Sequence, residues 1–153
     1  MSNIIVKQYI PLDANLLKFR DQEEYIHILK AYPMYFEELL AICQGNAYSI
    51  FKDGEIIAIT GWVPSIQNFC QIWFFSSENL DKMFDKYVYN AFKMILNVAK
   101  SEWERIETTC KENKRNKRFL EFLGFKQECL MKKYGFNGED MYLYALISER
   151  KHV

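Results

Sequence analysis

The chain lacks several features that mark specialised classes of protein. Its 20 Lys and Arg residues balance 20 Asp and Glu residues, so net charge gives no general attraction to nucleic acid or to a membrane. Its four cysteines show no metal-ligand spacing, and no metal site is expected. They lie in apolar or strand-like runs, which predicts buried free thiols at Cys43, Cys70, Cys110 and Cys129.

Neither a leader segment nor a membrane-spanning run is expected from the sequence. Residues 1–7 have no basic region followed by an apolar one, and no apolar run approaches the roughly 20 residues that cross a bilayer. A reducing cytoplasm is therefore the expected location. The length of 153 residues favours one domain over residues 1–153, with half of its residues hydrophobic and no need of cross-links.

Hydrophobic patterning predicts a mixed α/β domain. Strands are expected over residues 3–10, 47–51, 55–62, 69–75, 105–110, 126–134 and 141–147. Helices are expected from about residue 14, with Asp13 as the cap, and over 21–31, 34–43, 80–99 and 113–123. Asp53-Gly54 and Asn137-Gly138 are typical of hairpin turns.

The segment 113–125 gives the most specific local pattern. Phe119, Phe122 and Leu123 form one apolar stripe of a short helix. Gly124 is expected to end this helix, because glycine adopts a left-handed backbone without penalty, and Phe125 would fold back on the stripe. The opposite side of the helix is basic: Lys114, Arg115, Lys117 and Arg118.

A strand, Asn113, a short helix, Leu123-Gly124-Phe125 and a final hairpin resemble the second half of the GNAT superfamily of N-acetyltransferases. The whole predicted order is similar to that fold, a mixed and mostly antiparallel sheet flanked by helices. The segments 72–74 and 113–124, with a long helix between them, further resemble GNAT-like proteins of tailed phages, some associated with virion assembly.

The resemblance implies acetyl-CoA as a cofactor, with its pyrophosphate at the loop after the central strand and at the N-terminus of the next helix. The matching stretch, 76–82, has no glycine and carries Glu78 and Asp81. N-capping of a helix is the alternative role for this stretch. The cofactor-binding residues that the resemblance implies are Phe74, Phe75, Ser76, Ser77, Asn113, Lys114 and Arg115.

The family's usual general acid and base are replaced in this chain. Leu120 stands at the position of the acid and Gln71 at that of the base, and neither side chain can exchange a proton. Tyr134 and Tyr142 are therefore the candidate catalytic residues, with Tyr144 as a further option. Packing in the sheet is the alternative role for all three tyrosines.

Three other polar groups have two interpretations each. His27 lies near Glu23 and Glu24 and is either a base or a surface histidine. The acidic residues of 21–38 either favour an amine substrate or form the wet faces of two helices. The basic residues of 111–118 meet either coenzyme phosphates or solvent, and nucleic acid is not expected as a partner.

Two function hypotheses remain open from the sequence. The first is an N-acetyltransferase that moves an acyl group from acyl-CoA to an amine acceptor. The second is a catalytically inactive interaction or assembly protein with protein partners, located in the host cytoplasm or the virion if it is encoded by a phage. Aromatic residues such as Trp62 and Trp73 leave a homo-oligomer open as well.

Overall fold

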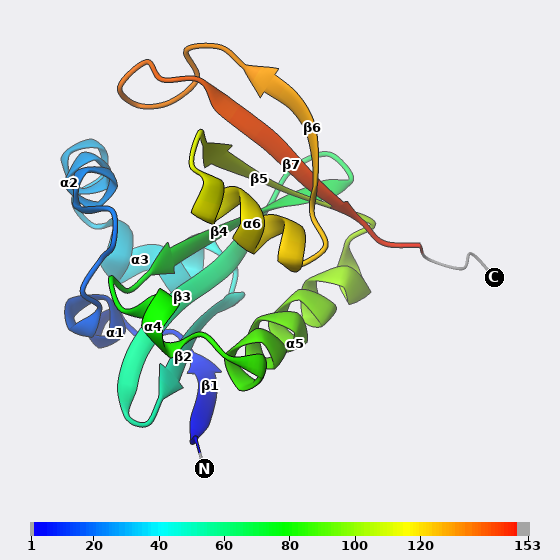
Figure 1. The fold of residues 1–153 in the computed structure, drawn as a ribbon. Coiled ribbons are helices and arrows are strands. Elements are labelled where there is room, and N and C mark those ends of the chain that lie inside the picture. The colour runs from blue at the N-terminus through cyan, green and yellow to red at the C-terminus, as the bar shows by residue number, and fades with distance from the viewer. Residues whose placement is uncertain (1, 150–153) are drawn as a thin grey trace. The chain divides into compact units, whose positions relative to one another are not determined.

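The structure is a computed structural model and describes residues 2–149 (Figure 1). These residues form six helices and seven strands, in the expected order except that two helices, α4 and α5, replace the one expected over residues 80–99. They are β1 (Ile4–Gln8), α1 (Pro11–Leu16), α2 (Gln22–Ala31), α3 (Tyr35–Ile42), β2 (Ala47–Lys52), β3 (Glu55–Pro64), β4 (Phe69–Ser76), α4 (Leu80–Met83), α5 (Lys86–Glu102), β5 (Arg105–Lys111), α6 (Lys114–Phe122), β6 (Lys126–Met131) and β7 (Met141–Ile147).

The strands form one sheet in the order β1-β2-β3-β4-β5-β7-β6. The neighbours β1/β2, β2/β3, β5/β7 and β6/β7 are antiparallel, whereas β4 and β5 are parallel. The predicted fold class, a mixed and mostly antiparallel sheet flanked by helices, is therefore confirmed. Within the described residues, no helix is long and apolar enough to cross a bilayer, and no cluster of three metal-ligating side chains occurs.

Backbone contacts divide the chain into two compact units. The first contains residues 2–63 and 73–95, and the second contains residues 64–72 and 96–149. Strand β4 and helix α5 are each divided between the two units, after Ile72 and after Ile95 respectively. The single domain expected over residues 1–153 stays a prediction.

The core of the first unit is aromatic. Phe19, Phe36 and Phe75 pack edge to face, with ring centroids 5.4 to 5.7 Å apart, and Tyr25 stacks on Phe19. Such pairs stabilise a core beyond the area that they bury. Trp62 is fully buried and stacks with Tyr48, and Trp73 packs against Phe75 at 5.0 Å. Trp62 is therefore not available to an oligomer interface, a role that the sequence had left open for it.

Helix α1 begins earlier than predicted. Pro11 occupies its first turn, where the missing N–H of proline has no partner to lose. Asp13 is therefore inside the helix, and its buried carboxylate accepts from Ile10 N at 3.1 Å and from Ser49 Oγ at 2.8 Å. The expectation that Asp13 is the cap is wrong by one helical turn.

The long helix expected over residues 80–99 is interrupted. Helix α4 ends at Met83, Phe84 has an extended backbone with ψ 122°, and α5 begins at Lys86. The carboxylate of Asp85 accepts from Tyr87 N at 3.0 Å and from Val88 N at 2.9 Å. The apolar stripe continues through the break, so periodicity alone does not reveal it.

The two predicted hairpin turns have different outcomes. Asp53 (φ 50°) and Gly54 (φ 84°) both have the left-handed backbone of a type I′ turn, and Lys52 pairs with Glu55. Asn137-Gly138 does not make such a turn, because only Gly138 has a positive φ and the connection covers residues 132–140. The predicted strand end at residue 134 is also too late, since β6 ends at Met131.

In the second unit, α6 lies against β5 (Figure 1). Gly124 has φ 102°, Phe125 N donates to Leu120 O at 3.0 Å, and Gly124 N donates to Glu121 O at 3.0 Å. This is the expected glycine stop in the form of a Schellman motif. The predicted apolar stripe is wrong in one member, because Phe122 is 62% exposed whereas Leu120 and Leu123 are buried.

The cysteine prediction holds for three of the four residues. Cys43, Cys70 and Cys110 are free and buried, and burial raises the pKa of the Cys70 thiol to about 12. Cys129 is free and exposed, contrary to the prediction. The reason is topological: β6 is the edge strand, and five of its six residues are exposed.

Candidate functional site

The loop after β4 binds its own chain in the first unit. Ser77 N donates to Ile57 O at 2.9 Å, and Glu78 N donates to Lys18 O at 2.9 Å. Asn79 N donates to Ser77 Oγ at 3.1 Å, and Leu80 N donates to Ser77 O at 3.1 Å. Four consecutive amides of the predicted pyrophosphate loop are thus already engaged, and the side chain of Ser77 is buried.

The start of α5 also has an internal partner. Lys52, on β2, donates to the carboxylate of Asp85 at 2.6 Å and to Met83 O at 2.8 Å. The Lys52 ammonium, followed by the amide of Val88, holds the pKa of the Asp85 carboxyl below its usual range. Asp85 therefore stays ionised at neutral pH and remains the acceptor for the first amides of α5.

These residues do not fit a pyrophosphate. A pyrophosphate site needs unengaged backbone amides or cationic side chains that converge on one anion. Here the loop amides donate within the chain, a carboxylate already caps α5, and Arg20 is paired with Asp81 at 2.8 Å. Phe74, Phe75, Ser76 and Ser77 keep their places at the end of β4 and in this loop, as the sequence predicts, and their cofactor role stays a prediction.

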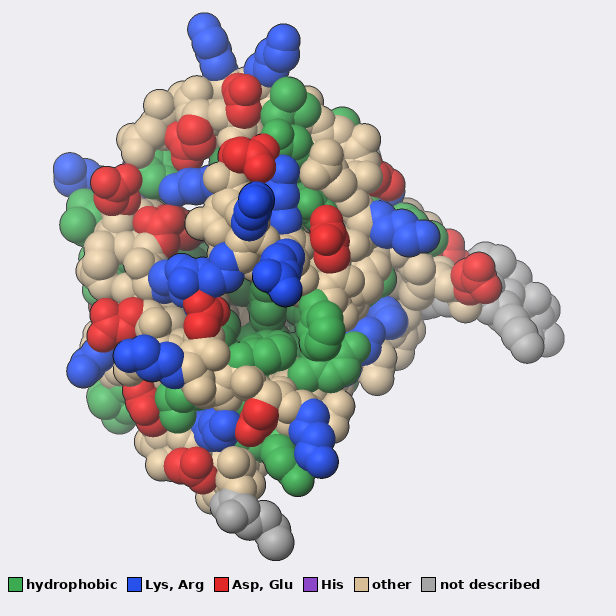
Figure 2. All heavy atoms as spheres, viewed as in Figure 1, with side chains coloured by type: hydrophobic (Ala, Val, Ile, Leu, Met, Phe, Trp, Pro, Cys, Tyr) green, Lys and Arg blue, Asp and Glu red, His purple; other side chains and the backbone are tan. Residues whose placement is uncertain are grey.

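In the second unit, Asn113 is the N-cap of α6. Its side-chain oxygen accepts from Arg115 N at 3.0 Å and from Asn116 N at 3.2 Å. Lys114 and Arg115 follow on the exposed first turn. Figure 2 shows Lys and Arg side chains over α6, interspersed with acidic ones. The structure thus gives Asn113 a capping role, and binding of a cofactor by these three residues stays a prediction.

Tyr142 has a specific set of partners in the second unit. Its hydroxyl hydrogen-bonds to the Glu112 carboxylate, which also accepts from Lys117 Nζ at 2.8 Å. The same ammonium lies 3.7 Å from the centroid of the Tyr142 ring. The hydrogen bond to Glu112 raises the pKa of Tyr142, so this phenol keeps its proton at neutral pH and can act as a donor but not as a base.

The other two tyrosines differ from Tyr142. Tyr134 is 60% exposed in the connection between β6 and β7. Tyr144 is fully buried, its hydroxyl donates to Gln127 Oε1 at 3.1 Å, and burial raises its pKa. Of the three, only Tyr142 combines partial exposure with a hydrogen bond to a carboxylate.

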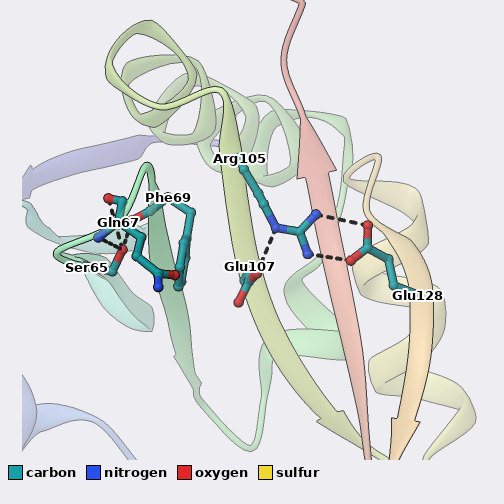
Figure 3. Close-up of polar contacts among 6 residues, drawn as sticks. All are labelled: Ser65, Gln67, Phe69, Arg105, Glu107 and Glu128. Atoms are coloured by element: carbon teal, nitrogen blue, oxygen red, sulfur yellow. Dashed lines mark hydrogen bonds and ion pairs between the residues drawn. The ribbon is translucent and has the colours of Figure 1, made fainter.

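A second polar group in this unit was not singled out by the sequence. Arg105, on β5, extends over β7 and makes a bidentate hydrogen bond with the carboxylate of Glu128 on β6 (Figure 3). It also donates from Nε to Glu107 at 2.7 Å. Glu107 pairs in register with Gln71 on β4, so a carboxylate lies on the strand next to the position that lacks the family's base. Its engagement by Arg105 favours a structural role.

Figure 3 also shows the turn that leads into β4. Ser65 Oγ donates to Phe69 O at 2.8 Å and accepts from Gln67 N at 3.1 Å. These bonds close a short loop of the second unit without a glycine.

Comparison with solved structures identifies the fold. An acetyltransferase of the GNAT family from Bacillus anthracis matches with TM-score 0.66 and 16% identity over 94% of this chain and 94% of that chain. The chain has the GNAT fold.

Two further matches have the same fold. RimJ of Mycobacterium smegmatis, in complex with CoA-disulfide, matches with TM-score 0.67 and 19% identity over 95% of this chain and 82% of that one. A spermidine N-acetyltransferase SpeG chimera from Vibrio cholerae and hSSAT matches with TM-score 0.67 and 13% identity over 94% and 95%. No family model and no curated protein sequence matches this chain.

Within the GNAT fold, the residues missed by sequence reasoning are the ones that pair across the chain. Lys52 and Asp85 are 33 residues apart, and Arg105 and Glu128 are 23 apart. A local signal existed only for Glu112 and Lys117, which flank the start of α6 five residues apart. Leu120 is buried in the structure, so the acid position of the family contributes to packing here.

Proposed function

We propose that this protein is an acyltransferase that moves an acetyl or other acyl group from a thioester to an amine acceptor. The observation that carries the proposal is the GNAT fold over nearly the whole chain. A neighbour with this fold binds CoA-disulfide and another is a spermidine N-acetyltransferase, which supports an acyl-CoA donor and an amine acceptor. Acetyl-CoA is the donor to test first.

Tyr142 is the proposed proton donor for this reaction. When the C–N bond forms and the C–S bond breaks, the leaving thiolate takes a proton from the phenol held protonated beside Glu112. The proton that the amine nitrogen loses goes to water, which returns a proton to Tyr142. Glu112 and Lys117 would fix the orientation of the Tyr142 hydroxyl and ring. Asn113, Lys114 and Arg115, on the adjoining turn, and residues 74–77 remain the proposed contacts for the donor.

The acceptor is proposed to be an amine in its uncharged form at the moment of attack. Positioning of the two reactants alone lowers a barrier by roughly 7–11 kcal/mol, so a strong base is not required. Exposed carboxylates of the first unit, such as Glu23, Glu37 and Glu38, would attract an ammonium form beforehand. The location proposed from the sequence is the cytoplasm.

A second function is favoured by two observations. The internal cap on α5 and the buried Leu120 remove two features on which acetyl transfer in this family depends. A catalytically inactive assembly or interaction protein, of tailed-phage origin, is the alternative proposal. Its partners would be proteins, including a second copy of the chain.

The deciding experiment measures acyl transfer directly. Purified protein is incubated with acetyl-CoA and a panel of polyamines, amino acids and peptides, and free CoA and acetylated product are quantified by chromatography. Release of CoA that requires an amine supports the enzyme. We expect Tyr142→Phe to lower kcat at least about tenfold with a smaller change in KM.

The control for that variant is Tyr48→Phe. It makes the same chemical change in a half-buried tyrosine of β2 that takes no part in the proposed chemistry. Absence of transfer with every amine, together with no binding of acetyl-CoA by calorimetry, would reject the enzyme and leave the assembly protein.

A further inference from the structure

The N-terminus of α5 carries an anion that belongs to the chain itself. Amides at the start of a helix attract anions because they have no partner within the helix and lie at the positive end of its dipole. Here Asp85 Oδ1 accepts from Tyr87 N at 3.0 Å and from Val88 N at 2.9 Å. An external phosphate would have to displace this carboxylate or approach within its repulsion.

Lys52 holds the carboxylate in place from the neighbouring strand β2. Its side chain is only 12% exposed, and its ammonium contacts both Asp85 and Met83 O. The charge of the Lys52 ammonium is therefore neutralised inside the protein and is not available to a phosphate group. Lys52 also fixes the break between α4 and α5, because Met83 O is the last carbonyl of α4.

The loop between β4 and α4 also lacks free donors for a pyrophosphate at four successive amides. Ser77, Glu78, Asn79 and Leu80 donate their amides within the chain, and Asp81 and Glu78 add negative charge at the surface. Asn79 Nδ2 donates to Glu55 at 3.1 Å. The donors that would be needed for a pyrophosphate are thus used to fold the loop.

We propose that Asp85, held by Lys52, replaces the donor's pyrophosphate at the N-terminus of α5. The protein would then take its thioester by the acyl-pantetheine part alone. The inference rests on the proposed acyl transfer, which makes the donor a thioester. It goes beyond that proposal because it excludes the nucleotide part of coenzyme A from the binding site. S-acylated pantetheine, free or carried on another molecule, is the substrate class that follows.

Calorimetric titration tests this with three probes: acetyl-CoA, S-acetylpantetheine and inorganic pyrophosphate. We expect the wild-type protein to bind the two thioesters with dissociation constants within about twofold of each other, and to give no heat with pyrophosphate. Binding of acetyl-CoA more than about tenfold tighter than S-acetylpantetheine would overturn the inference and leave the proposed acyl transfer standing.

Asp85→Ser opens the site without removing the cap. Serine is a good N-cap, so α5 should keep its helical circular dichroism, while the negative charge is gone and Lys52 is released. We expect this variant to bind acetyl-CoA about tenfold more tightly than wild type, with S-acetylpantetheine unchanged. Asp21→Ser makes the same change at the cap of α2, where the carboxylate accepts from Glu24 N, and should change acetyl-CoA binding less than about twofold.

A wild-type protein that binds neither thioester would reject the proposed acyl transfer. The acyl-pantetheine donor would be rejected with it, whereas the blocking of the α5 N-terminus by Asp85 would still stand if Asp85→Ser then bound acetyl-CoA or pyrophosphate. That blocking would be overturned if Asp85→Ser folded normally and bound neither of them.

Discussion

The Lys52 ammonium donates to the Asp85 carboxylate across 2.6 Å and links the end of β2 to the start of α5. This contact is also why the helix expected over residues 80–99 is two helices. Asp85 satisfies two amides of α5 and Lys52 satisfies the last carbonyl of α4, so both ends at the break have partners.

A double-mutant cycle should detect this pair through its pH dependence. The pKa of Asp85 is lowered in the folded state, chiefly by Lys52. Its contribution to stability is therefore complete above the unfolded value of about 3.9 and is lost as pH falls through the lower folded value. Urea unfolding of Lys52→Met, Asp85→Asn and the double variant should give a favourable coupling at about pH 6 that shrinks toward about pH 2. A coupling that is the same at both pH values would contradict this account.

Gly61 should not tolerate a side chain. A Cβ at this position of β3 would lie 2.5 Å from Asn46 O and 2.7 Å from the Trp73 ring. The backbone oxygen cannot move as a flexible side chain would, so Gly61→Ala should lower the free energy of unfolding by about 1–3 kcal/mol. Urea denaturation measures the loss.

The control for Gly61 is a glycine with open space around it. Nothing lies within 4 Å of a Cβ at Gly54, whose φ of 84° is one that asparagine tolerates. Gly54→Asn should therefore change stability by less than Gly61→Ala does. The reverse order of the two effects would show that the β3 contact has been misjudged.

Asn113 has two assignments that one pair of variants can separate. Loss of its cap in Asn113→Ala should lower the free energy of unfolding by about 1 kcal/mol, because Arg115 N and Asn116 N lose their acceptor. Asn113→Ser keeps a capping oxygen and should restore most of that stability. If Asn113→Ser is stable but binds acetyl-CoA less well than wild type, Asn113 also contacts the cofactor.

Features that depend on neighbouring residues could be predicted from the sequence. Asp53-Gly54 forms the expected turn and Gly124 the expected helix stop, because both follow from the backbone freedom of the residues themselves. The order of elements and the mixed α/β class follow from periodicity, whereas the mostly antiparallel sheet was implied by the resemblance to the GNAT superfamily.

Features that depend on distant partners could not be predicted. Cys129 is exposed because β6 is the edge strand of the sheet. The hydrophobic pattern of a single strand does not predict its position in the strand order. The helix break depends on Lys52, and the hydrogen bond of Tyr142 depends on Glu112 across the β5–β7 pairing. The sequence named Tyr142 as a candidate, but its partners became visible only in the structure.

The exposed position of Cys129 predicts selective labelling. Burial raises the pKa of the Cys43 and Cys110 thiols to about 11 and that of Cys70 to about 12, so these three are protonated and shielded at pH values near 8. A thiol-reactive disulfide reagent should modify one cysteine rapidly in the native protein and all four in urea. Cys129→Ser should abolish the rapid phase and Cys110→Ser should leave it. Rapid labelling of the Cys129→Ser protein would contradict the burial of the other three.

Tyr142 should titrate above the ordinary pKa of a tyrosine, because its hydrogen bond to the Glu112 carboxylate raises its pKa. Glu112→Gln removes the carboxylate charge and should lower the pKa of Tyr142, which carbon NMR of labelled tyrosine rings can measure directly. In an active enzyme the same variant should move the alkaline limb of kcat to lower pH, since the proton donor is lost earlier as pH rises. Glu139→Gln is the matched control, because Glu139 pairs with Lys111 at 3.7 Å instead. If Glu112→Gln lowers the pKa of Tyr142 measured by NMR but leaves the alkaline limb of kcat unchanged, the ionisation of Tyr142 does not limit the reaction. Tyr142 would then not be the proton donor.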